Sequence, residues 1–264
     1  MTKKLKSEPF AILKSSCIRP LSAELVYENE EVIDYASDKG ALFLISDEVD
    51  PEPSSIVVKN FPELKKLEHG RIVYYAGKLK IGSYHLDLSH AKIFSTADVY
   101  LKNYNEIFYD GLNRFISENY SCELYAPSVK KVCRTLLEFK PENLYDSYYL
   151  ESLIGFGIGM TPSGDDFLVG LMASLKGSYF FERVKEAINK ALIKTNSISR
   201  EFLRCAVLGE FSASFAELIQ AANDEIDTEK YFLKISLKGH TSGKESLLGF
   251  LKGLEIRKRS FIRP

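Results

Sequence analysis

The sequence predicts an α+β protein in which a β-rich part, residues 1–100, is followed by a mainly helical domain, residues 101–264. Three observations lead to this prediction. Short β-branched and alternating apolar runs are concentrated in the first hundred positions, and from about Val99 onward apolar residues recur at intervals of three and four. Two similar glycine-containing turns then interrupt the helical pattern. Strands followed by helices are typical of an α+β architecture.

The β-rich part is predicted from runs with a period of two. Residues 55–58 form a β-branched run. Residues 71–75 and 79–81 flank Gly77, which indicates a hairpin that turns at the glycine. The alternation continues through residues 84–88. We therefore expect a small antiparallel sheet or a barrel-like domain.

The helical domain is predicted from apolar stripes. Each stripe is expected to pack against neighbouring helices, and none is assigned to a ligand. The stripes are Ile107, Gly111 and Phe115; Val129, Val132, Leu136 and Leu137; Phe167, Leu168, Leu171, Met172 and Leu175; Ile198, Phe202, Leu203, Ala206 and Val207; Phe211, Phe215, Leu218 and Ile219; and Leu247, Leu248, Leu251 and Leu254.

The composition is that of an ordinary globular protein. Hydrophobic residues make up 45% of the 264 residues, charged residues 27%, and the formal net charge is -1. Such a balance gives no electrostatic bias toward nucleic acid or membrane. No apolar run approaches the roughly 20 residues that a membrane span needs. We therefore expect a cytoplasmic protein that binds neither nucleic acid nor membrane.

The cysteines are predicted to be free thiols. Cys17, Cys122, Cys133 and Cys205 are far apart in the sequence and form no C-x-x-C pair. The four histidines show no zinc-ligand spacing either, so a structural zinc site is not expected.

The two turns share one pattern. Residues 159–166 are Gly-Met-Thr-Pro-Ser-Gly-Asp-Asp, and residues 239–245 are Gly-His-Thr-Ser-Gly-Lys-Glu. Each is a Thr/Ser-Gly turn that opens an amphipathic helix. A helix N-terminus carries roughly half a positive charge and up to four free N–H donors, so two of them could receive an anion or a developing oxyanion. The site hypothesis requires that the two helix starts converge on a shared pocket.

A purely structural alternative exists for both turns. Ser163 with Asp166, and Ser242 with Glu245, have the spacing of a capping box. Such a cap stabilises a helix by about 1 kcal/mol. It does not require the alternating glycines at 155, 157 and 159, and these favour a functional interpretation of the first turn.

The charges separate the two turns. Asp165 and Asp166 would repel a bare phosphate unless Mg²⁺ bridges them to it or they accept hydrogen bonds from an N–H₂ or hydroxyl group. Lys244 and His240 would add to the helix dipole and favour an anion. We therefore expect a ligand with an anionic end near residues 239–244 and an amide-like or metal-bridged end near residues 161–166.

These considerations define a candidate site. The catalytic candidates are Asp165, Asp166 and His240. The ligand-binding candidates are Gly157, Gly159, Thr161, Ser163, Gly164, Thr241, Ser242, Gly243 and Lys244. No cofactor is required, and Mg²⁺ is left open with Asp165 and Asp166 as its ligands.

Several common motifs do not fit. Residues 239–245 have one residue too few between their glycines for a P-loop, and Glu245 stands where Ser or Thr should hold Mg²⁺. Residues 155–159 lack the spacing and the βαβ context of a dinucleotide fingerprint. No G-x-S-x-G nucleophile elbow is present.

Residues 155–170, centred on Thr-Pro-Ser-Gly-Asp-Asp-Phe-Leu, resemble the signature of a bacterial family long catalogued as a domain of unknown function. That family includes the AllH-type subunit of oxamate carbamoyltransferase, from anaerobic allantoin breakdown. Residues 197–209 and 240–249 resemble it too. The resemblance implies a subunit of a carbamoyl-transferring system that acts with other subunits on carbamoyl phosphate and oxamate or oxalurate.

The chemistry suits the candidate residues. Carbamoyl transfer needs a phosphate leaving group to be held, an attacking nitrogen to be oriented, and a tetrahedral oxyanion to be met by fixed donors. Paired helix N-termini could hold the phosphate and the oxyanion, while Asp165 or Asp166 orients the N–H₂ group and Lys244 or His240 neutralises the anion. Three hypotheses stay open: a carbamoyltransferase subunit, a Mg²⁺-dependent hydrolase or phosphotransferase, and a non-catalytic partner subunit.

Overall fold

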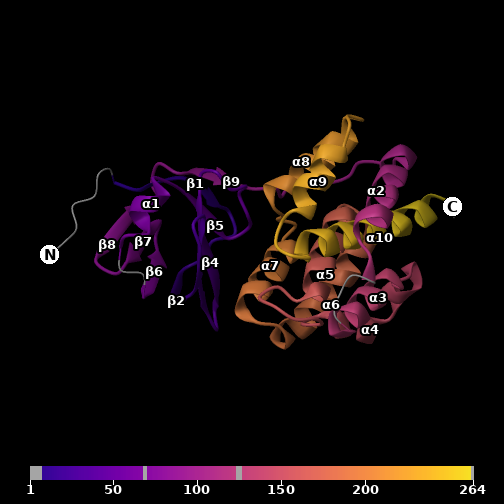
Figure 1. Cartoon of the computed structure of the whole chain (residues 1–264), viewed down its shortest axis with the longest axis horizontal. Helices are drawn as coiled ribbons and strands as arrows, with labels where there is room; N and C mark the ends of the chain where they lie inside the picture. Colours follow the sequence, from indigo (N-terminus) through magenta and orange to yellow (C-terminus); the bar gives the residue numbers. More distant parts are fainter. Residues whose placement is uncertain (1–7, 68–69, 123–126, 263–264) are drawn as a thin grey trace. The chain divides into compact units, whose positions relative to one another are not determined.

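The computed structural model describes residues 8–67, 70–122 and 127–262. The chain divides into two compact units, residues 1–96 and residues 97–264. Strands fill the first unit and helices the second (Figure 1). The predicted α+β class is confirmed.

The first unit is built on a curled sheet (Figure 1). In its described part the sheet has nine strands in the order β8-β7-β6-β2-β3-β4-β5-β1-β9. The strands are β1 (Phe10–Ser15), β2 (Leu21–Glu28), β3 (Val32–Ser37), β4 (Gly40–Ser46), β5 (Ser55–Lys59), β6 (Arg71–Tyr75), β7 (Lys78–Ile81), β8 (Tyr84–Asp87) and β9 (Lys92–Phe94). The sheet is mixed, because β4 pairs with β5 and β1 with β9 in parallel.

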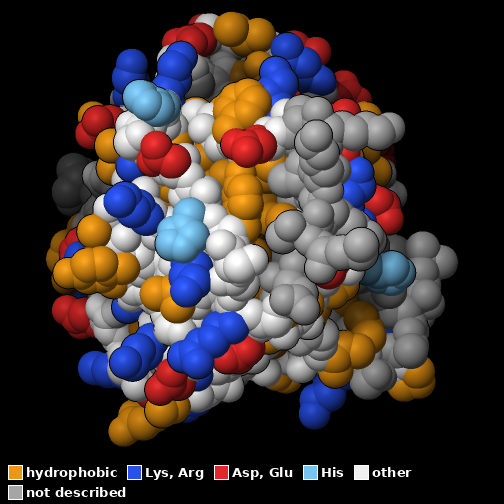
Figure 2. All heavy atoms as spheres, turned by 90° about the vertical axis from the view of Figure 1, so that its left-hand side faces the viewer, with side chains coloured by type: hydrophobic (Ala, Val, Ile, Leu, Met, Phe, Trp, Pro, Cys, Tyr) orange, Lys and Arg blue, Asp and Glu red, His pale blue; other side chains and the backbone are white. Residues whose placement is uncertain are grey.

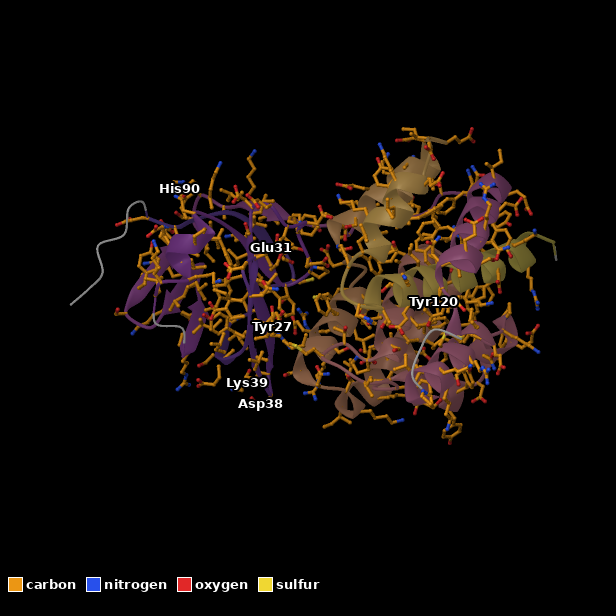
Figure 3. All side chains as sticks on the ribbon, in the orientation of Figure 1. Tyr27, Glu31, Asp38, Lys39, His90 and Tyr120 are labelled. Carbon is orange, nitrogen blue, oxygen red and sulfur yellow. A yellow bond between two sulfur atoms is a disulfide. The ribbon has the colours of Figure 1, made fainter. Side chains whose placement is uncertain are left out.

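The strands expected from the sequence are present. Residues 55–58 lie in β5, and the predicted hairpin is β6 and β7. Its two-residue turn places Ala76 and Gly77 at positive φ, the conformation that favours glycine in tight hairpins. Asp38 and Lys39 form the turn between β3 and β4 (Figure 3). The parallel pairing of β4 with β5 was not expected, because strand propensity does not indicate whether two neighbouring strands run parallel or antiparallel.

One face of the sheet forms the core of the first unit. Its apolar side chains pack together with the short helix α1 (Phe61–Leu64). The outer surface carries acidic, basic and apolar side chains intermixed on the face seen in Figure 2. A mixed surface of this kind agrees with the near-zero net charge.

The second unit is helical. Its elements are α2 (Glu106–Asn119), α3 (Pro127–Leu137), the 3₁₀ turn η2 (Pro141–Tyr145), α4 (Ser147–Leu153), α5 (Ser163–Leu175), α6 (Tyr179–Ala191), the 3₁₀ turn η3 (Leu192–Lys194), α7 (Ser197–Val207), α8 (Ala213–Asn223), α9 (Glu229–Ser236) and α10 (Ser242–Ile262). No described helix is both long enough and apolar enough to cross a bilayer.

The predicted stripes fall on α2, α3, α5, α7, α8 and α10. Most of their side chains are in one hydrophobic core. Ile107 is the clear exception, since it is 85% exposed at the start of α2. Helices α4, α6 and α9 were not expected individually, although Phe181, Val184 and Ile188 of α6 have the helical spacing.

The prediction of free thiols is wrong for two cysteines. Cys122 and Cys133 form a disulfide, with 5.6 Å between their Cα atoms. The pair is separated by 11 residues, and α3 brings its second member back beside the first. Such a return depends on the fold rather than on a local motif. Cys17 and Cys205 are buried and are not disulfide-bonded, as expected.

Glycines allow α5 and α10 to pack closely (Figure 1). A Cβ at Gly249 would lie 1.9 Å from the carbonyl oxygen of Phe167, and one at Gly170 would lie 1.8 Å from that of Ser246. No side chain larger than hydrogen fits at such distances. The close packing matters for function because it fixes the start of α5 against the start of α10.

Replacing Gly249 with alanine is therefore expected to destabilise the protein by at least about 2 kcal/mol, because the added methyl group forces two backbones apart. The urea midpoint measures this loss. Gly111→Ala is the matched control: there the Cβ would meet the Phe232 ring at an ordinary 3.8 Å. In that helix interior the change should stabilise by roughly 0.5–1 kcal/mol. Equal effects of the two substitutions would contradict the packing argument.

Candidate functional site

The starts of α5 and α10 meet. The hydroxyl oxygens of Thr161 and Ser242 are 2.9 Å apart, although the two residues are separated by 81 positions in the sequence. Thr161 lies two residues before Ser163, the first residue of α5, and Ser242 is the first residue of α10. The two turns are thus in contact, which is a condition of the site hypothesis.

The capping box that the sequence offered for Ser163 and Asp166 is wrong. Pro162 occupies the cap position of α5, so Ser163 is already helical and its side chain makes no cap. In α10 the residue before the helix is Thr241, whose hydroxyl donates to the Glu245 carboxylate at 3.1 Å. The reason is Pro162, whose extended ψ of 141° makes it the cap, so the preceding loop ends one residue earlier than the serine pattern suggests.

The N–H groups of α5 are largely used by the protein itself. The amide of Gly164 donates to the Phe156 carbonyl at 2.8 Å, and the amide of Asp165 donates to the Pro162 carbonyl at 2.9 Å. A Cβ at Gly157 would lie 2.7 Å from the Ser163 nitrogen, so the preceding chain covers the helix start. Contrary to expectation, α5 does not present an open set of donors.

The start of α10 is flanked by basic side chains. The amides of Gly243 and Glu245 donate to the carbonyls of Lys238 and Thr241, each at 3.0 Å. His240 beside them is exposed, and Lys244 is partly exposed. The positive end of the dipole and the two basic side chains make this helix start the one suited to an anion.

Asp165 is an organising residue. Asp165 is only 1% exposed. One carboxylate oxygen accepts the Gly155 amide at 2.8 Å, and the other accepts the hydroxyls of Thr195 at 2.5 Å and Ser199 at 2.7 Å. Burial raises the pKa of Asp165, while the hydrogen bonds lower it. Because both oxygens are engaged, Asp165 fixes the chain before α5 to the start of α7.

Residues 154–162, the glycine loop, are held at several points. Gly155 has a φ of 74°, and a Cβ there would lie 2.5 Å from the Lys194 carbonyl oxygen. The Asn196 side chain donates to the Met160 carbonyl at 2.9 Å and accepts the Ser199 amide at 3.0 Å. Thr195, Asn196 and Ser199 were not among the predicted site residues. An asparagine just before a helical stripe is the local pattern that could have indicated Asn196.

Asp166 is in a different environment from its neighbour. Its Oδ2 atom is buried and has no hydrogen-bond partner in the described protein. Burial raises the pKa of Asp166 well above its usual value, against the opposing effect of the Ser242 and Thr161 hydroxyls, and the nearby Glu245 charge raises it further. A buried carboxyl oxygen without a hydrogen bond is costly, so Oδ2 of Asp166 is a candidate for contact with a ligand.

Glu245 comes from the other helix start. The residue is 1% exposed. Burial raises its pKa, and the hydroxyls of Ser163 and Thr241 and the charge of His240 act in the opposite direction. We call Thr161, Ser163, Asp166, Thr241, Ser242 and Glu245 the carboxyl–hydroxyl cluster. It combines hydroxyl donors with two carboxyl groups whose protonated forms are favoured by burial.

The remaining predicted site residues have other positions. Gly164 and Gly243 are packing positions, since a Cβ would lie 2.0 Å from the Leu153 carbonyl oxygen and 1.8 Å from that of Ile235, respectively. Gly157 packs on Ser163, whereas Gly159 is exposed at the outer end of the glycine loop with open space beside it. Glu245, omitted from the predicted site residues although noted in the turn pattern, faces Asp166 from the second helix start.

A metal-bridged arrangement has little support from the geometry. The described residues contain no group of three or more His, Cys, Asp or Glu side chains arranged to hold a metal ion. Asp165 and Asp166 would have to share the ion, yet both oxygens of Asp165 accept protein hydrogen bonds. The donor set therefore fits a hydrogen-bonding site better than a Mg²⁺ site.

The comparison with protein families bears directly on this region. Residues 153–254 match the family model described as oxamate carbamoyltransferase subunit AllH. The matched segment begins at the end of α4 and runs into α10, so it contains both turns and all of the carboxyl–hydroxyl cluster. No solved structure matches the chain significantly. The match confirms the resemblance predicted for the glycine loop and extends the similarity to the AllH family over residues 153–254.

Proposed function

We propose that this chain is a subunit of a carbamoyltransferase-type system and that the carboxyl–hydroxyl cluster binds its carbamoyl substrate. The observation that carries the proposal is the buried, unpartnered Oδ2 of Asp166 at the junction of two helix starts. The AllH match over the same residues supports the carbamoyl chemistry.

A carbamoyl group matches the polar atoms of the cluster. It has an N–H₂ group that donates and a carbonyl oxygen that accepts. The carboxyl of Asp166 can accept from the N–H₂ group, and the hydroxyls of Thr161 and Ser242 can rotate to donate to the carbonyl oxygen. Donors already in place for that oxygen also meet the negative charge that develops on it during transfer.

The anionic end of the substrate is assigned to α10. Its dipole, the side chain of Lys244 and the nearby His240 favour a phosphate or carboxylate. The sequence also predicts the anionic end of the ligand at this helix start. The assignment differs from that prediction in one respect, since both helix starts were expected to donate to the ligand and only the start of α10 is now assigned to the anion. Asp165 then acts as a positioning residue that holds the glycine loop.

Raised pKa values help the two carboxyl groups to tolerate an anion. A neutral Asp166 or Glu245 does not repel a phosphate, whereas two ionised carboxylates would. Burial and mutual repulsion raise the pKa of Asp166, so anion binding and proton uptake should be linked. Substrate binding is therefore expected to weaken as the pH rises.

Thermal unfolding in the presence of ligands tests the proposal. Carbamoyl phosphate without metal is expected to raise the melting temperature, because a ligand at a hundred times its Kd stabilises by about 2.7 kcal/mol. Ser242→Ala should lose this shift. Ser152→Ala is the matched control, since Ser152 is exposed on α4 and its hydroxyl donates only to the Tyr149 carbonyl.

Other outcomes would contradict the proposal in distinct ways. A shift that appears only with Mg²⁺ and disappears in Asp166→Asn would favour the metal-dependent hydrolase or phosphotransferase. The absence of any shift with carbamoyl phosphate, phosphate or oxamate would favour a non-catalytic partner subunit.

A further inference from the structure

The helical unit has a second feature, a groove of about 670 Å³ that includes no residue of either turn. One wall comes from the chain entering α2 and from α2 itself, over residues 102–118. The other comes from the end of α8, the connection to α9 and the start of α9, over residues 222–232. Tyr120 follows α2 (Figure 3). We call this feature the α2–α9 groove.

The floor of the α2–α9 groove is apolar and elongated. Phe108, Gly111 and Phe115 follow one face of α2 at helical spacing. Phe232 of α9 packs against both phenylalanines, with ring centroids 5.8 Å from Phe108 and 5.6 Å from Phe115. Gly111 has no side chain, and a Cβ there would lie 3.8 Å from the Phe232 ring.

The rim is acidic and carries exposed apolar side chains. Five carboxylate residues and two cationic residues line the groove, which gives the lining residues a formal net charge of -3, although Glu106 among them is ion-paired with Lys258 of α10. The carboxylates are Glu106, Glu118, Glu225, Asp227 and Glu229, and the cations are Lys102 and Arg114. Ile107 is 85% exposed and Ile226 is 55% exposed. Both lie on the rim, where an isolated protein gains nothing by exposing them.

We propose that the α2–α9 groove receives a basic amphipathic helix from a partner protein. A helix with apolar anchors at i, i+3, i+4 and i+7 places its apolar face on the phenylalanine floor. Lysine or arginine side chains beside those anchors then face the acidic rim. Charge complementarity selects this occupant over an acidic peptide or a free anion, both of which the rim would repel.

The groove is independent of the carboxyl–hydroxyl cluster. No lining residue of the groove belongs to either turn. The groove proposal therefore does not depend on whether the cluster binds a carbamoyl substrate. Failure of the two proposals is also distinguishable, because groove variants should keep the thermal shift with carbamoyl phosphate.

A labelled 18-residue peptide tests the proposal against the whole chain. Its lysines and leucines are arranged so that the leucines form one helical face, and a permuted peptide of the same composition has no such face. Fluorescence anisotropy at physiological salt should show saturable binding of the first peptide alone. Glu225→Lys with Glu229→Lys should weaken this binding at least about tenfold, since both charges face the occupant.

The matched control places the same two changes on another helix. Glu182 and Glu186 of α6 are exposed and have the same spacing of four residues. Glu182→Lys with Glu186→Lys should leave peptide binding within about twofold of the parent. Lys102→Glu should strengthen it, because this change removes a repelling cation from the rim.

Three results would overturn the proposal. The permuted peptide could bind equally well, or the α6 variant could lose binding as much as the groove variant does. Alternatively, sedimentation could show that the chain is a dimer. If Ile107→Asp dissociated this dimer and the peptide did not dissociate it, the occupant of the groove would be a second copy of this chain.

Discussion

Asp165→Ala is expected to destabilise the helical unit by roughly 3–5 kcal/mol, because two buried donors and one part-buried donor lose their acceptor at once. The donors are the Gly155 amide and the hydroxyls of Thr195 and Ser199. Urea or thermal unfolding measures the loss. With about 2–4 °C per kcal/mol for a unit of this size, the melting temperature should fall by about 10 °C.

The functional consequence of Asp165→Ala should be as large. Without that carboxylate the glycine loop loses its attachment to α7, and Thr161 is no longer held against Ser242. Carbamoyl phosphate should then produce no thermal shift even at temperatures where the variant is folded.

Two variants serve as controls for Asp165. Asp165→Asn keeps one acceptor oxygen and should have an intermediate stability. Asp224→Ala removes an exposed carboxylate that accepts only the Gln220 amide group, at 3.0 Å, and should change stability by less than about 0.5 kcal/mol. If Asp165→Ala behaved like Asp224→Ala, Asp165 would not be the residue that organises the loop.

The division of roles between Asp165 and Asp166 shows what the sequence could and could not predict. Both acids follow Ser163-Gly164 and were assigned equal catalytic candidacy. Successive residues of a helix point in different directions. The carboxyl of Asp165 therefore faces Ser199 of α7 and Thr195, which precedes α7, whereas that of Asp166 faces Ser242 of α10. The sequence shows two adjacent aspartates, but it does not show which helices lie beside each of them.

The helix starts were predictable because their cause is local. Proline at 162 and the Thr-Ser-Gly run before Lys244 end one element and begin another within a few residues. The hydrophobic stripes placed most helices for the same reason. The parallel strand pairs, the Cys122–Cys133 disulfide and the Asn196 bond to Met160 join distant segments, and no local pattern encodes them.

The covering of the α5 donors also lay beyond a sequence argument. The glycines at 155, 157 and 159 were interpreted as positions where the backbone could approach a ligand. Gly155 and Gly157 do approach closely, but what they approach is the protein: the Lys194 carbonyl and the Ser163 amide. A close approach can be inferred from glycine spacing, whereas the partner cannot.

Asp166→Asn is expected to stabilise the protein at neutral and alkaline pH while it abolishes ligand binding. The folded-state pKa of Asp166 is raised above its unfolded value, so the folded protein keeps a proton that the unfolded chain has lost. Stability should therefore fall as the pH rises from about 4, the unfolded pKa of aspartate, toward the higher folded value. Asparagine carries no charge, so the variant should be free of this loss and gain about 1–3 kcal/mol at pH 8.

Urea unfolding at pH 4 and pH 8 checks the sign of the effect. The parent and Asp166→Asn should be similar at pH 4 and should diverge at pH 8, with the variant more stable. Glu245→Gln should show the same trend more weakly, because the Thr241 hydroxyl partly satisfies the carboxylate of Glu245. A variant that is less stable than the parent at pH 8 would mean that Asp166 is ionised and well solvated, contrary to its burial.

Ligand binding and turnover of Asp166→Asn must be measured together with its stability. Asparagine keeps one acceptor oxygen but cannot take up or release a proton. Loss of a group that moves a proton typically lowers turnover by 10²- to 10⁴-fold, so we expect at least about a hundredfold loss of turnover in the proposed transferase. A residue kept only for packing would not both destabilise the folded protein and be required for ligand binding. Greater stability together with lost binding would identify Asp166 as a group retained for function at the expense of the fold, and unchanged carbamoyl phosphate binding would remove it from the site.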